Sequence, residues 1–443
     1  MTLRFGTDGV RGVANSELTP ELVLALGRAA ARVLDGDTFA VGRDTRRSGE
    51  MLQAALSAGL AAEGMQVLDL GVLPTPGVAF VAADCGWPGA MISASHNPFT
   101  DNGVKFFAEG GRKLTDEQEE RLEAELDAVL AGSRGTSPAV GEVHTPRRLV
   151  DRFVDHVVES VEGRRLHGMS VVLDCANGAA SEVAPEAFMR LGATVRVIAA
   201  LPDGSNINEG CGSTHPEQLQ AAVVEHGAAL GLAFDGDADR VLAVDHRGRL
   251  VDGDHLIALC AVDLRERGRL ADDTVVVTVM TNLGFHLAMG ERGIRVHETQ
   301  VGDRYVLEAL DANGWSLGGE QSGHVIFRDL ATTGDGILTG VQVADLVHRA
   351  GRPLADLADA AMTRLPQVLR NVRVADRDAL AGAEAVWDEV AEVEAELGDH
   401  GRVLLRPSGT EPLVRVMVEA PTPEQAEAAA GRLADAVVRA CGG

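Results

Sequence analysis

Apolar and polar positions follow two alternating periods along most of the chain, one typical of strands and one of helices. The run that begins at Thr19 and ends at Gly36 shows the helical period, with Thr as a predicted N-cap, Pro at the first helical position and Gly after the end. The further elements predicted in this first unit are a strand at 39–42, a helix at 48–63, a strand at 67–70 and a helix opened by a capping box at 115–118.

The same alternation of strands and helices returns twice more. The second unit has predicted strands at 171–174, 195–198 and 230–234, and predicted helices near 183–191 and from 216. The third unit has predicted strands at 274–279 and 294–298, and predicted helices at 285–292, 303–312 and from about 335. Beyond about 365 the order changes to a strand at 368–374, a long acidic helix at 377–397, two strands flanking 406–412 and a final helix opened by a capping box at 422–425.

Strands that alternate with helices of 10–15 residues imply mostly parallel sheets. The pattern therefore predicts an α/β protein, with three similar mixed-sheet α/β domains and a smaller C-terminal α+β domain. The expected domain boundaries are 1–150, 151–250, 251–365 and 366–443. Polar and glycine residues cluster at the ends of the predicted strands, which is where open α/β sheets bind ligands.

The excess of acidic residues excludes some classes of binding partner. The 443 residues include 66 Asp and Glu against 40 Lys and Arg, a formal net charge of −26, and only 3% are aromatic. Such a chain repels a phosphate backbone and lacks a base-stacking surface, so nucleic acid is not an expected partner. With 45% hydrophobic residues the chain is not disordered, and no apolar run is long enough to cross a membrane. Five scattered cysteines and a polar start predict a cytoplasmic protein.

The first candidate site is the run Asp235-Gly-Asp237-Ala-Asp239-Arg240, which directly follows an apolar strand. Three carboxylates at alternate positions can converge on one hard cation. An EF-hand loop is excluded, because Arg240 stands at the sixth position in place of Gly and His246 at the twelfth in place of Glu. An Asp/Gly-rich turn is the plainer interpretation, but three crowded carboxylates stay ionised more easily beside a cation. A Mg²⁺ site is the favoured prediction.

Three further loops combine reactive side chains with turn-forming residues. The run 91–98 holds Ser93, Ser95, His96 and Pro98, without the Gly-x-Ser-x-Gly pattern of a hydrolase. The run 318–324 places Glu, Gln, Ser and His between glycines, which suits a polyhydroxylated ligand. The run 406–412, with Arg415 behind it, could clamp a phosphate. Taken alone, the runs 91–98 and 318–324 are more simply interpreted as ordinary turns, whereas the clustered anion-binding groups of 406–412 favour a phosphate site.

Taken together, these motifs resemble the bacterial phosphoglucosamine mutases, within the α-D-phosphohexomutase superfamily. The shared motifs run from end to end in the order of that family: 5–12, 93–98, 235–240, 319–324 and 406–412. Stretches that resemble the glucosamine branch in particular are 206–208, 211–216, 301–305 and Gln321. Ala238 stands where many relatives have Gly, and it leaves the three carboxylates intact.

The resemblance implies a mechanism built around a phosphorylated Ser95. The four domains would surround a central cleft, with the Ser95 loop on the first, the metal loop on the second, the sugar-recognition loop on the third and the phosphate-binding loop on the fourth. One Mg²⁺ would be held by Asp235, Asp237, Asp239 and an oxygen of the phosphate on Ser95. Reversible conversion of glucosamine 6-phosphate to glucosamine 1-phosphate would pass through a sugar 1,6-bisphosphate, which also serves as activator, and would feed cell-wall precursor synthesis.

The same resemblance assigns the remaining roles. Glu320 and Ser322 would hold sugar hydroxyls, while Lys105 and His324 would transfer protons. The groups implied to bind phosphate or support its charge are Arg11, Arg43, Arg240, Arg406, Ser408, Gly409, Thr410 and Arg415. The expected partner is a small phosphosugar, with a homodimer left open. A phosphomannomutase or phosphoglucomutase of the same superfamily, and a non-catalytic phosphosugar-binding protein, are the alternatives; the retained Ser95 and aspartates argue against the latter.

Overall fold

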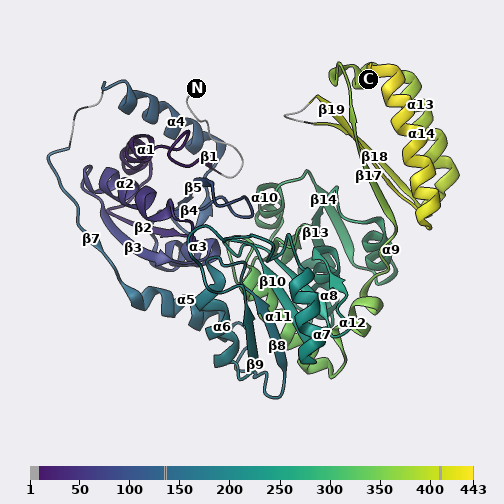
Figure 1. The fold of residues 1–443 in the computed structure, drawn as a ribbon, viewed down its shortest axis with the longest axis horizontal. Coiled ribbons are helices and arrows are strands. Elements are labelled where there is room, and N and C mark those ends of the chain that lie inside the picture. The colour runs from purple at the N-terminus through teal and green to yellow at the C-terminus, as the bar shows by residue number, and fades with distance from the viewer. Residues whose placement is uncertain (1–8, 134, 136, 409–411, 443) are drawn as a thin grey trace. The chain divides into compact units, whose positions relative to one another are not determined.

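The structure is a computed structural model that describes the chain except for residues 1–8, 134, 136, 409–411 and 443 (Figure 1). The described chain divides into two compact units. The first contains Met1–Met280 and Arg295–Ala361, and the second contains Thr281–Ile294 and Met362–Gly443. Three sheets belong to the first unit and one to the second.

The first sheet is mixed and carries the N-terminal part of the chain. Its strands lie in the order β1 (Val10–Val13), β5 (Asp101–Ala108), β4 (Gly89–Ile92), β2 (Thr38–Arg43), β3 (Gln66–Val72) and β7 (Val143–His144), with β6 (Arg112–Lys113) beside β5. The four strands β4, β2, β3 and β7 run parallel, whereas β5 is antiparallel to both β4 and β1. The helices of this region are α1 (Pro20–Val33), α2 (Gly49–Ala61), α3 (Thr75–Cys85) and α4 (Asp116–Leu130).

The N-terminal caps that the sequence predicts for two helices are present in the structure. Thr19 caps α1 by accepting a hydrogen bond from the backbone of Leu22, and Thr115 with Gln118 forms the complete capping box of α4. Where α1 and α2 cross, Gly27 and Gly59 let the backbones touch: a Cβ on Gly27 would lie 2.4 Å from the carbonyl oxygen of Leu56. This close crossing packs α1 and α2 tightly against each other.

The second and third sheets repeat the α/β pattern. The second has the order β12 (Leu250–Val251), β11 (Val241–Asp245), β10 (Leu230–Phe234), β8 (Ser170–Asp174) and β9 (Thr194–Ile198), accompanied by α5 (Arg147–Glu159), α6 (Ala180–Arg190) and α7 (Glu217–His226). The third has the order β14 (Arg295–Thr299), β13 (Thr274–Thr278), β15 (Leu317–Gly319) and β16 (Val325–Phe327), with α8 (Gly253–Glu266), α10 (Asp303–Asn313), α11 (Gly336–Ala350) and α12 (Leu354–Ala361). Helix α11 is buried along its first twelve residues, so it is a central element of the first unit.

The second unit is built on a three-stranded antiparallel sheet. Its strands are β17 (Gln367–Arg373), β19 (Leu413–Glu419) in the centre and β18 (Arg402–Pro407), and its helices are α9 (Leu283–Glu291), α13 (Glu384–Leu397) and α14 (Pro423–Cys441). Apolar residues of the sheet, α13 and α14 form its core. The fold class predicted from the sequence is confirmed: three mixed α/β sheets precede a smaller α+β part.

One element begins later than the sequence predicts. The acidic helix expected from 377 starts at Glu384, because Asp378–Gly382 forms a tight 3₁₀ turn and Ala383 has a non-helical ψ of 73°. The indole Nε1 of Trp387 donates to the carbonyl of Leu380 at 3.0 Å, which fastens that turn to the helix. A side chain from the first turn of the helix thus stabilises the break that periodicity alone does not reveal.

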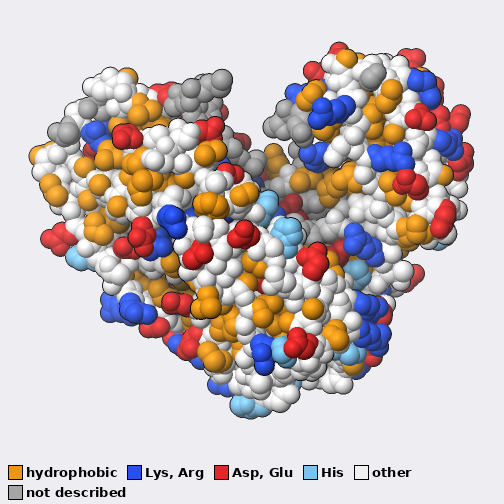
Figure 2. Space-filling model, in the orientation of Figure 1, with side chains coloured by type: hydrophobic (Ala, Val, Ile, Leu, Met, Phe, Trp, Pro, Cys, Tyr) orange, Lys and Arg blue, Asp and Glu red, His pale blue; other side chains and the backbone are white. Residues whose placement is uncertain are grey.

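On the face seen in Figure 2, acidic and basic side chains are interspersed rather than gathered into one large patch. Among the described residues, no helix combines the length and the apolar character that a membrane crossing requires.

Candidate active site

Three of the predicted loops begin where a strand ends within the first unit. Ser93 follows β4, Asp235 follows β10 and Glu320 follows β15. Backbone hydrogen bonds join two of these loops directly: Val241, just after the aspartate loop, donates to the carbonyl of Gly323 at 3.0 Å. The three loops therefore share one site at the carboxyl ends of strands, as is usual for open α/β sheets.

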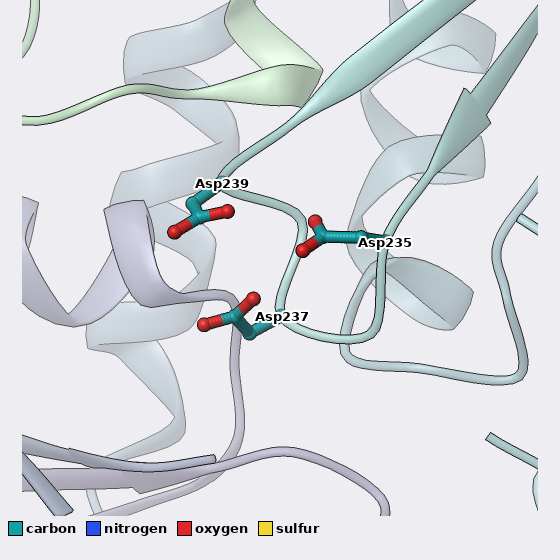
Figure 3. Close-up of side chains that lie close together, drawn as sticks. All are labelled: Asp235, Asp237 and Asp239. Atoms are coloured by element: carbon teal, nitrogen blue, oxygen red, sulfur yellow. The ribbon is translucent and has the colours of Figure 1, made fainter. Parts of the chain in front are cut away.

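The carboxylates of Asp235, Asp237 and Asp239 point toward one another from a single loop (Figure 3). A ligand oxygen from each lies within 4.8 Å of those of the other two, and all three residues are buried. The Oδ1 atoms of Asp237 and Asp239 are buried without a hydrogen-bond partner among the described residues. Buried, unsatisfied carboxylate oxygens in this arrangement fit a hard divalent cation, for which oxygen is the preferred ligand.

Tight backbone contacts hold the aspartate loop in place. Gly236 has no room for a side chain, because a Cβ there would lie 2.6 Å from the carbonyl oxygen of Ser95. Ala238 adopts a positive φ of 54°, and its carbonyl accepts from Gly336 at the start of α11. Thr75 at the start of α3 donates twice to Asp237, from its backbone N at 3.0 Å and from Oγ1 at 2.5 Å. The Ser95 loop, α3 and α11 thus position the carboxylates.

Ser95 lies against this loop. Its side chain is buried and its Oγ donates to Oδ2 of Asp235 at 2.6 Å. Its backbone is left-handed, with a φ of 51°, a conformation that non-glycine residues rarely adopt. The neighbouring His96 places Nδ1 3.4 Å from the same Oγ. The structure therefore brings the predicted nucleophile into direct contact with a predicted metal ligand.

The charges around the carboxylates are unevenly distributed. Lys105 on β5 is buried, with Nζ 2.9 Å from Oδ2 of Asp237 and 3.4 Å from Oδ2 of Asp239. Burial and the adjacent carboxylates of Asp239 and Asp237 raise the pKa of Asp235 well above its usual value. Burial would also raise the pKa of Asp239, but Lys105 and His324 hold it well below its usual value. The charge of Arg240 partly offsets the rise in the pKa of Asp235, the carboxylate that Ser95 contacts.

His324 lies at the edge of the same cluster. It is buried, its Nδ1 is 3.8 Å from Oδ2 of Asp239, and its Nε2 accepts from the backbone N of Gly334 at 3.0 Å. That acceptor role assigns the ring proton to Nδ1, which faces Asp239. Burial alone would lower the pKa of His324, but the nearby carboxylates of Asp239 and Asp303 raise it.

The sugar-recognition loop leaves polar atoms available. Oε1 of Glu320 accepts from the backbone N of Gly302 at 3.1 Å, which orients the carboxylate. The Oγ of Ser322 and the Nε2 of Gln321 are buried without a partner among the described residues. A loop with unsatisfied hydroxyl and amide groups beside an oriented carboxylate is suited to binding hydroxyls.

The predicted arginines of the first unit fall into two groups. Arg11 on β1 and Arg240 both lie close enough to His96 to act on it: burial is the largest cause that lowers the pKa of His96, followed by the charges of Arg240 and Arg11. Burial would lower the pKa of Arg240 itself, but Asp239 and Asp235 raise it. Arg43, by contrast, bonds to Gln53 at 2.9 Å and Glu50 at 3.1 Å, away from the carboxylates.

Sequence reasoning missed the pair Asp44 and Arg46. Both side chains are fully buried beneath the Ser95 loop, where Arg46 donates to Asp44 at 2.8 Å and to the carbonyl of Ser95 at 2.9 Å. The available signal was their position, since charged residues that directly follow the apolar strand β2 stand at the same sheet edge as the other motifs.

The predicted phosphate clamp belongs to the second unit. Arg406 on β18 and Arg415 on β19 are directly opposite each other in the sheet, and Nε of Arg415 is buried without a partner among the described residues. Ser408 is buried, and Arg377 donates to its carbonyl. Gly409 and Thr410 lie outside the described residues. Two facing guanidinium groups repel each other until an anion lies between them, which suits phosphate.

Models of the four domains of one family match the chain in order. They are the phosphoglucomutase/phosphomannomutase alpha/beta/alpha domain I at residues 2–131, domain II at 151–248, domain III at 252–365 and the C-terminal domain at 369–436. Among curated relatives, the phosphoglucosamine mutase of Streptomyces griseus is 58% identical, with 99% of each chain covered. The phosphoglucosamine mutase of Rhodococcus opacus is 56% identical, with 98% of each chain covered.

Solved structures show the same fold over nearly the whole chain. A phosphoglucomutase/phosphomannomutase family protein from Burkholderia thailandensis is 28% identical with a TM-score of 0.84, covering 99% of this chain and 98% of its own. The N-acetylphosphoglucosamine mutase of Aspergillus fumigatus, solved with GlcNAc-6P and magnesium, is 19% identical with a TM-score of 0.70, covering 100% and 96%. The resemblance seen in the sequence is confirmed: the chain belongs to the phosphoglucomutase/phosphomannomutase family, and its curated relatives there are phosphoglucosamine mutases.

Proposed function

We propose that this protein is an isomerase that interconverts glucosamine 6-phosphate and glucosamine 1-phosphate through a phosphorylated Ser95. The observation that carries the proposal is the 2.6 Å contact between Oγ of Ser95 and Asp235, beside two further buried carboxylates. A serine that only stabilised a loop would not need three buried acids around it. Names of relatives at 56–58% identity favour the glucosamine substrate over mannose or glucose phosphates.

The proposed chemistry is transfer of one phosphoryl group out and one back. The P–O bond of phospho-Ser95 breaks as O1 of glucosamine 6-phosphate forms a new one, the hydroxyl proton leaves O1, and glucosamine 1,6-bisphosphate results. The bisphosphate then reorients so that its 6-phosphate faces Ser95. Ser95 Oγ accepts the 6-phosphoryl group, and the sugar O6 recovers a proton. A Mg²⁺ ion held by the three aspartates and a phosphate oxygen would supply charge neutralisation.

The chain's own residues position and support these transfers. Lys105 is within 3.4 Å of two of the aspartates, and His324 is 3.8 Å from one, so both are proposed proton carriers at the reacting oxygens. Arg11 and Arg240 supply positive charge near His96, beside Ser95. Glu320 and Ser322 are proposed to hold the sugar hydroxyls in either orientation of the substrate.

The remaining assignments are proposals of the same kind. Arg406, Ser408, Gly409, Thr410 and Arg415 would bind the phosphate that is not reacting. The bisphosphate would also restore phosphate to a Ser95 that has lost it. We further propose domain boundaries at 1–150, 151–250, 251–365 and 366–443, and a cytoplasmic location suited to a pathway of small phosphosugars.

Replacing Ser95 tests the function directly. The Ser95→Ala variant is expected to fold and to lose mutase activity by at least about a thousandfold, because no oxygen remains to carry the phosphoryl group. The matched control is Ser133→Ala, which removes an exposed hydroxyl that donates to the carbonyl of Ala128, and which should keep full activity. Activity is measured by a coupled assay of glucosamine 1-phosphate formation.

Mass spectrometry of the intact protein shows which of the candidate sugar phosphates is the substrate. Wild-type protein should carry one phosphate, which exposure to glucosamine 6-phosphate removes or exchanges more readily than exposure to mannose 6-phosphate or glucose 6-phosphate. Full activity of Ser95→Ala would refute the phosphoserine route, and loss of the phosphate only to sugars without the amine would reassign the substrate.

A further inference from the structure

Four backbone carbonyls of the Ser95 loop converge on one buried point. They belong to Ser95, Asn97, Pro98 and Asp101, and each accepts a hydrogen bond from the guanidinium of Arg46. Three of the distances are 2.9, 2.8 and 3.0 Å for Ser95, Asn97 and Asp101. Carbonyl oxygens that meet without a donor would repel one another and stay unsatisfied, so the loop has this shape only around a cation with several N–H groups.

Arg46 has no N–H group to spare. Its Nε donates to Oδ2 of Asp44, one terminal nitrogen donates to Pro98 and Asp101, and the other donates to Ser95 and Asn97. A guanidinium has five N–H donors in a planar fork, and here all five are used in a side chain that is 1% exposed. Lysine offers three donors and no fork, so it cannot reproduce the arrangement.

Asp44 extends the same network to the other side of Ser95. Its Oδ1 accepts from the backbone N of Arg46 at 3.0 Å, and its Oδ2 also accepts from Oγ of Ser93 at 2.6 Å. That same Oγ accepts from the backbone N of Ser95 at 2.9 Å. The backbone N–H of Ser95 is therefore held through Ser93 and Asp44, and its C=O is held by Arg46, with a second bond to that carbonyl from Asn208 at 2.9 Å.

Holding both backbone groups determines where the side chain points. Ser95 sits at a φ of 51°, which a serine leaves readily unless its surroundings impose it. If the loop relaxed to an ordinary negative φ, Oγ would swing away from Asp235. Displacing a reacting atom by about 1 Å can cost a hundredfold in rate, even when the altered residue is remote from the chemistry.

We propose that Arg46, together with Asp44 and Ser93, is a positioning residue that holds Ser95 in its left-handed conformation and so aims its Oγ at the site of phosphoryl transfer. This inference rests on the proposed function, because it deepens the role of Ser95. In the described contacts, Arg46 bonds to none of the predicted metal ligands Asp235, Asp237 and Asp239, so it acts through the backbone of Ser95. The consequence is a defect in the transfer step rather than in sugar binding.

The test compares Arg46→Lys with Arg32→Lys as a matched control. Arg32 is partly buried and bonds to Glu63, Glu125 and the carbonyl of Gly135, and it lies on α1 outside the Ser95 loop. Thermal unfolding, kcat and KM for glucosamine 6-phosphate, and the single-turnover rate of phosphate loss from phospho-Ser95 are measured on each, well below the unfolding temperature. Arg46→Lys should lower kcat and the single-turnover rate by about a hundredfold with KM changed less than about threefold.

Ser93→Ala provides a second variant that removes one hydroxyl and leaves the guanidinium in place. It should lower kcat about tenfold, again with little change in KM, because the N–H of Ser95 loses its acceptor. A normal kcat in both variants, whatever their unfolding temperatures, would show that the network is only structural and overturn the proposal. A wild-type protein that is itself inactive on every phosphosugar would instead refute the proposed function, so the two failures are distinguishable.

Discussion

At the scale of single residues, the groups proposed to react and the groups that orient Ser95 depend on different parts of the chain. Ser95 and the three aspartates stand in motifs whose residue types already suggest their chemistry. Arg46 does not, because an arginine in a polar run is usually exposed; its burial comes from carbonyls of a loop some fifty residues later. Such convergence depends on the paired positions of β2 and β4, which no local pattern encodes.

The aspartate cluster makes a prediction at this scale that needs no assay of activity. Asp237→Asn keeps the shape of the side chain but removes one of three close negative charges. We expect the metal-free variant to be less stable than the wild type, because the substitution breaks the buried ion pair between Asp237 and Lys105. Its affinity for Mg²⁺, measured by calorimetry, should fall at least about tenfold, with a smaller rise in unfolding temperature on adding Mg²⁺.

The control for that measurement is Asp359→Asn, an exposed aspartate paired with Arg249. It changes the net charge equally and should leave Mg²⁺ affinity unchanged. Equal Mg²⁺ affinity for Asp237→Asn and the wild type would show that the three carboxylates do not hold the ion.

At the scale of elements, periodicity located most strands and helices because burial repeats along them, but it left their ends uncertain. The late start of α13 depends on a contact between Trp387 and a turn before the helix. The predicted start of a helix near 335 agrees with α11, but the pattern does not reveal the environment of Asp335, which is buried and whose carboxylate accepts from the backbone N of Ile337 and Leu338 at 2.9 Å each. Burial depends on the packing of other elements and has no local signature.

The buried cap of α11 makes stability depend on pH. Burial raises the pKa of Asp335 to about 7, although its two backbone hydrogen bonds partly oppose the shift. In the unfolded chain this carboxyl ionises near its ordinary value of about 3.9. Between these two values only the folded chain keeps the proton, so the contribution of Asp335 to the free energy of unfolding falls as pH rises from about 4 to 7.

Asp335→Asn removes this titration and keeps a side-chain oxygen as the cap acceptor. The free energy of unfolding of the variant relative to the wild type should therefore rise across the window from pH 4 to 7, by an amount on the order of 1.4 kcal/mol for each unit of the pKa shift. Urea unfolding at several pH values measures the difference. A difference that stays constant with pH would contradict the assignment.

At the scale of the whole molecule, the sequence correctly predicted three α/β parts followed by an α+β part. It did not predict that residues 281–294 group with the C-terminal part. Glu419, at the end of β19, explains the grouping: its buried carboxylate accepts from the backbone N of Leu283 at 2.8 Å and from Nδ2 of Asn282 at 3.1 Å. A contact between positions almost 140 residues apart is invisible to any periodicity.

Replacing Glu419 by glutamine should weaken its hydrogen bonds to Asn282 and Leu283. Both carboxylate oxygens of Glu419 accept hydrogen bonds. An amide in either orientation would place its NH₂ group against one of these donors, which lowers the stability by about 1–3 kcal/mol. Hydrogen exchange should accelerate in α9 while β2 and β10 keep their protection. The control is Glu392→Gln, which alters an exposed carboxylate near Arg432. Unchanged exchange in α9 would show that other contacts hold the segment.

The left-handed backbone conformation of Ser95 also lowers the stability of the fold, because this position carries a side chain. Glycine adopts a positive φ without strain, whereas serine or alanine there costs about 1 kcal/mol or more. Selection for a durable fold alone would favour glycine at this position. Ser95→Gly should therefore resist denaturant better than Ser95→Ala, although both lack the hydroxyl. The difference in stability between them measures the cost of a side chain in this left-handed conformation, which the proposed nucleophile requires.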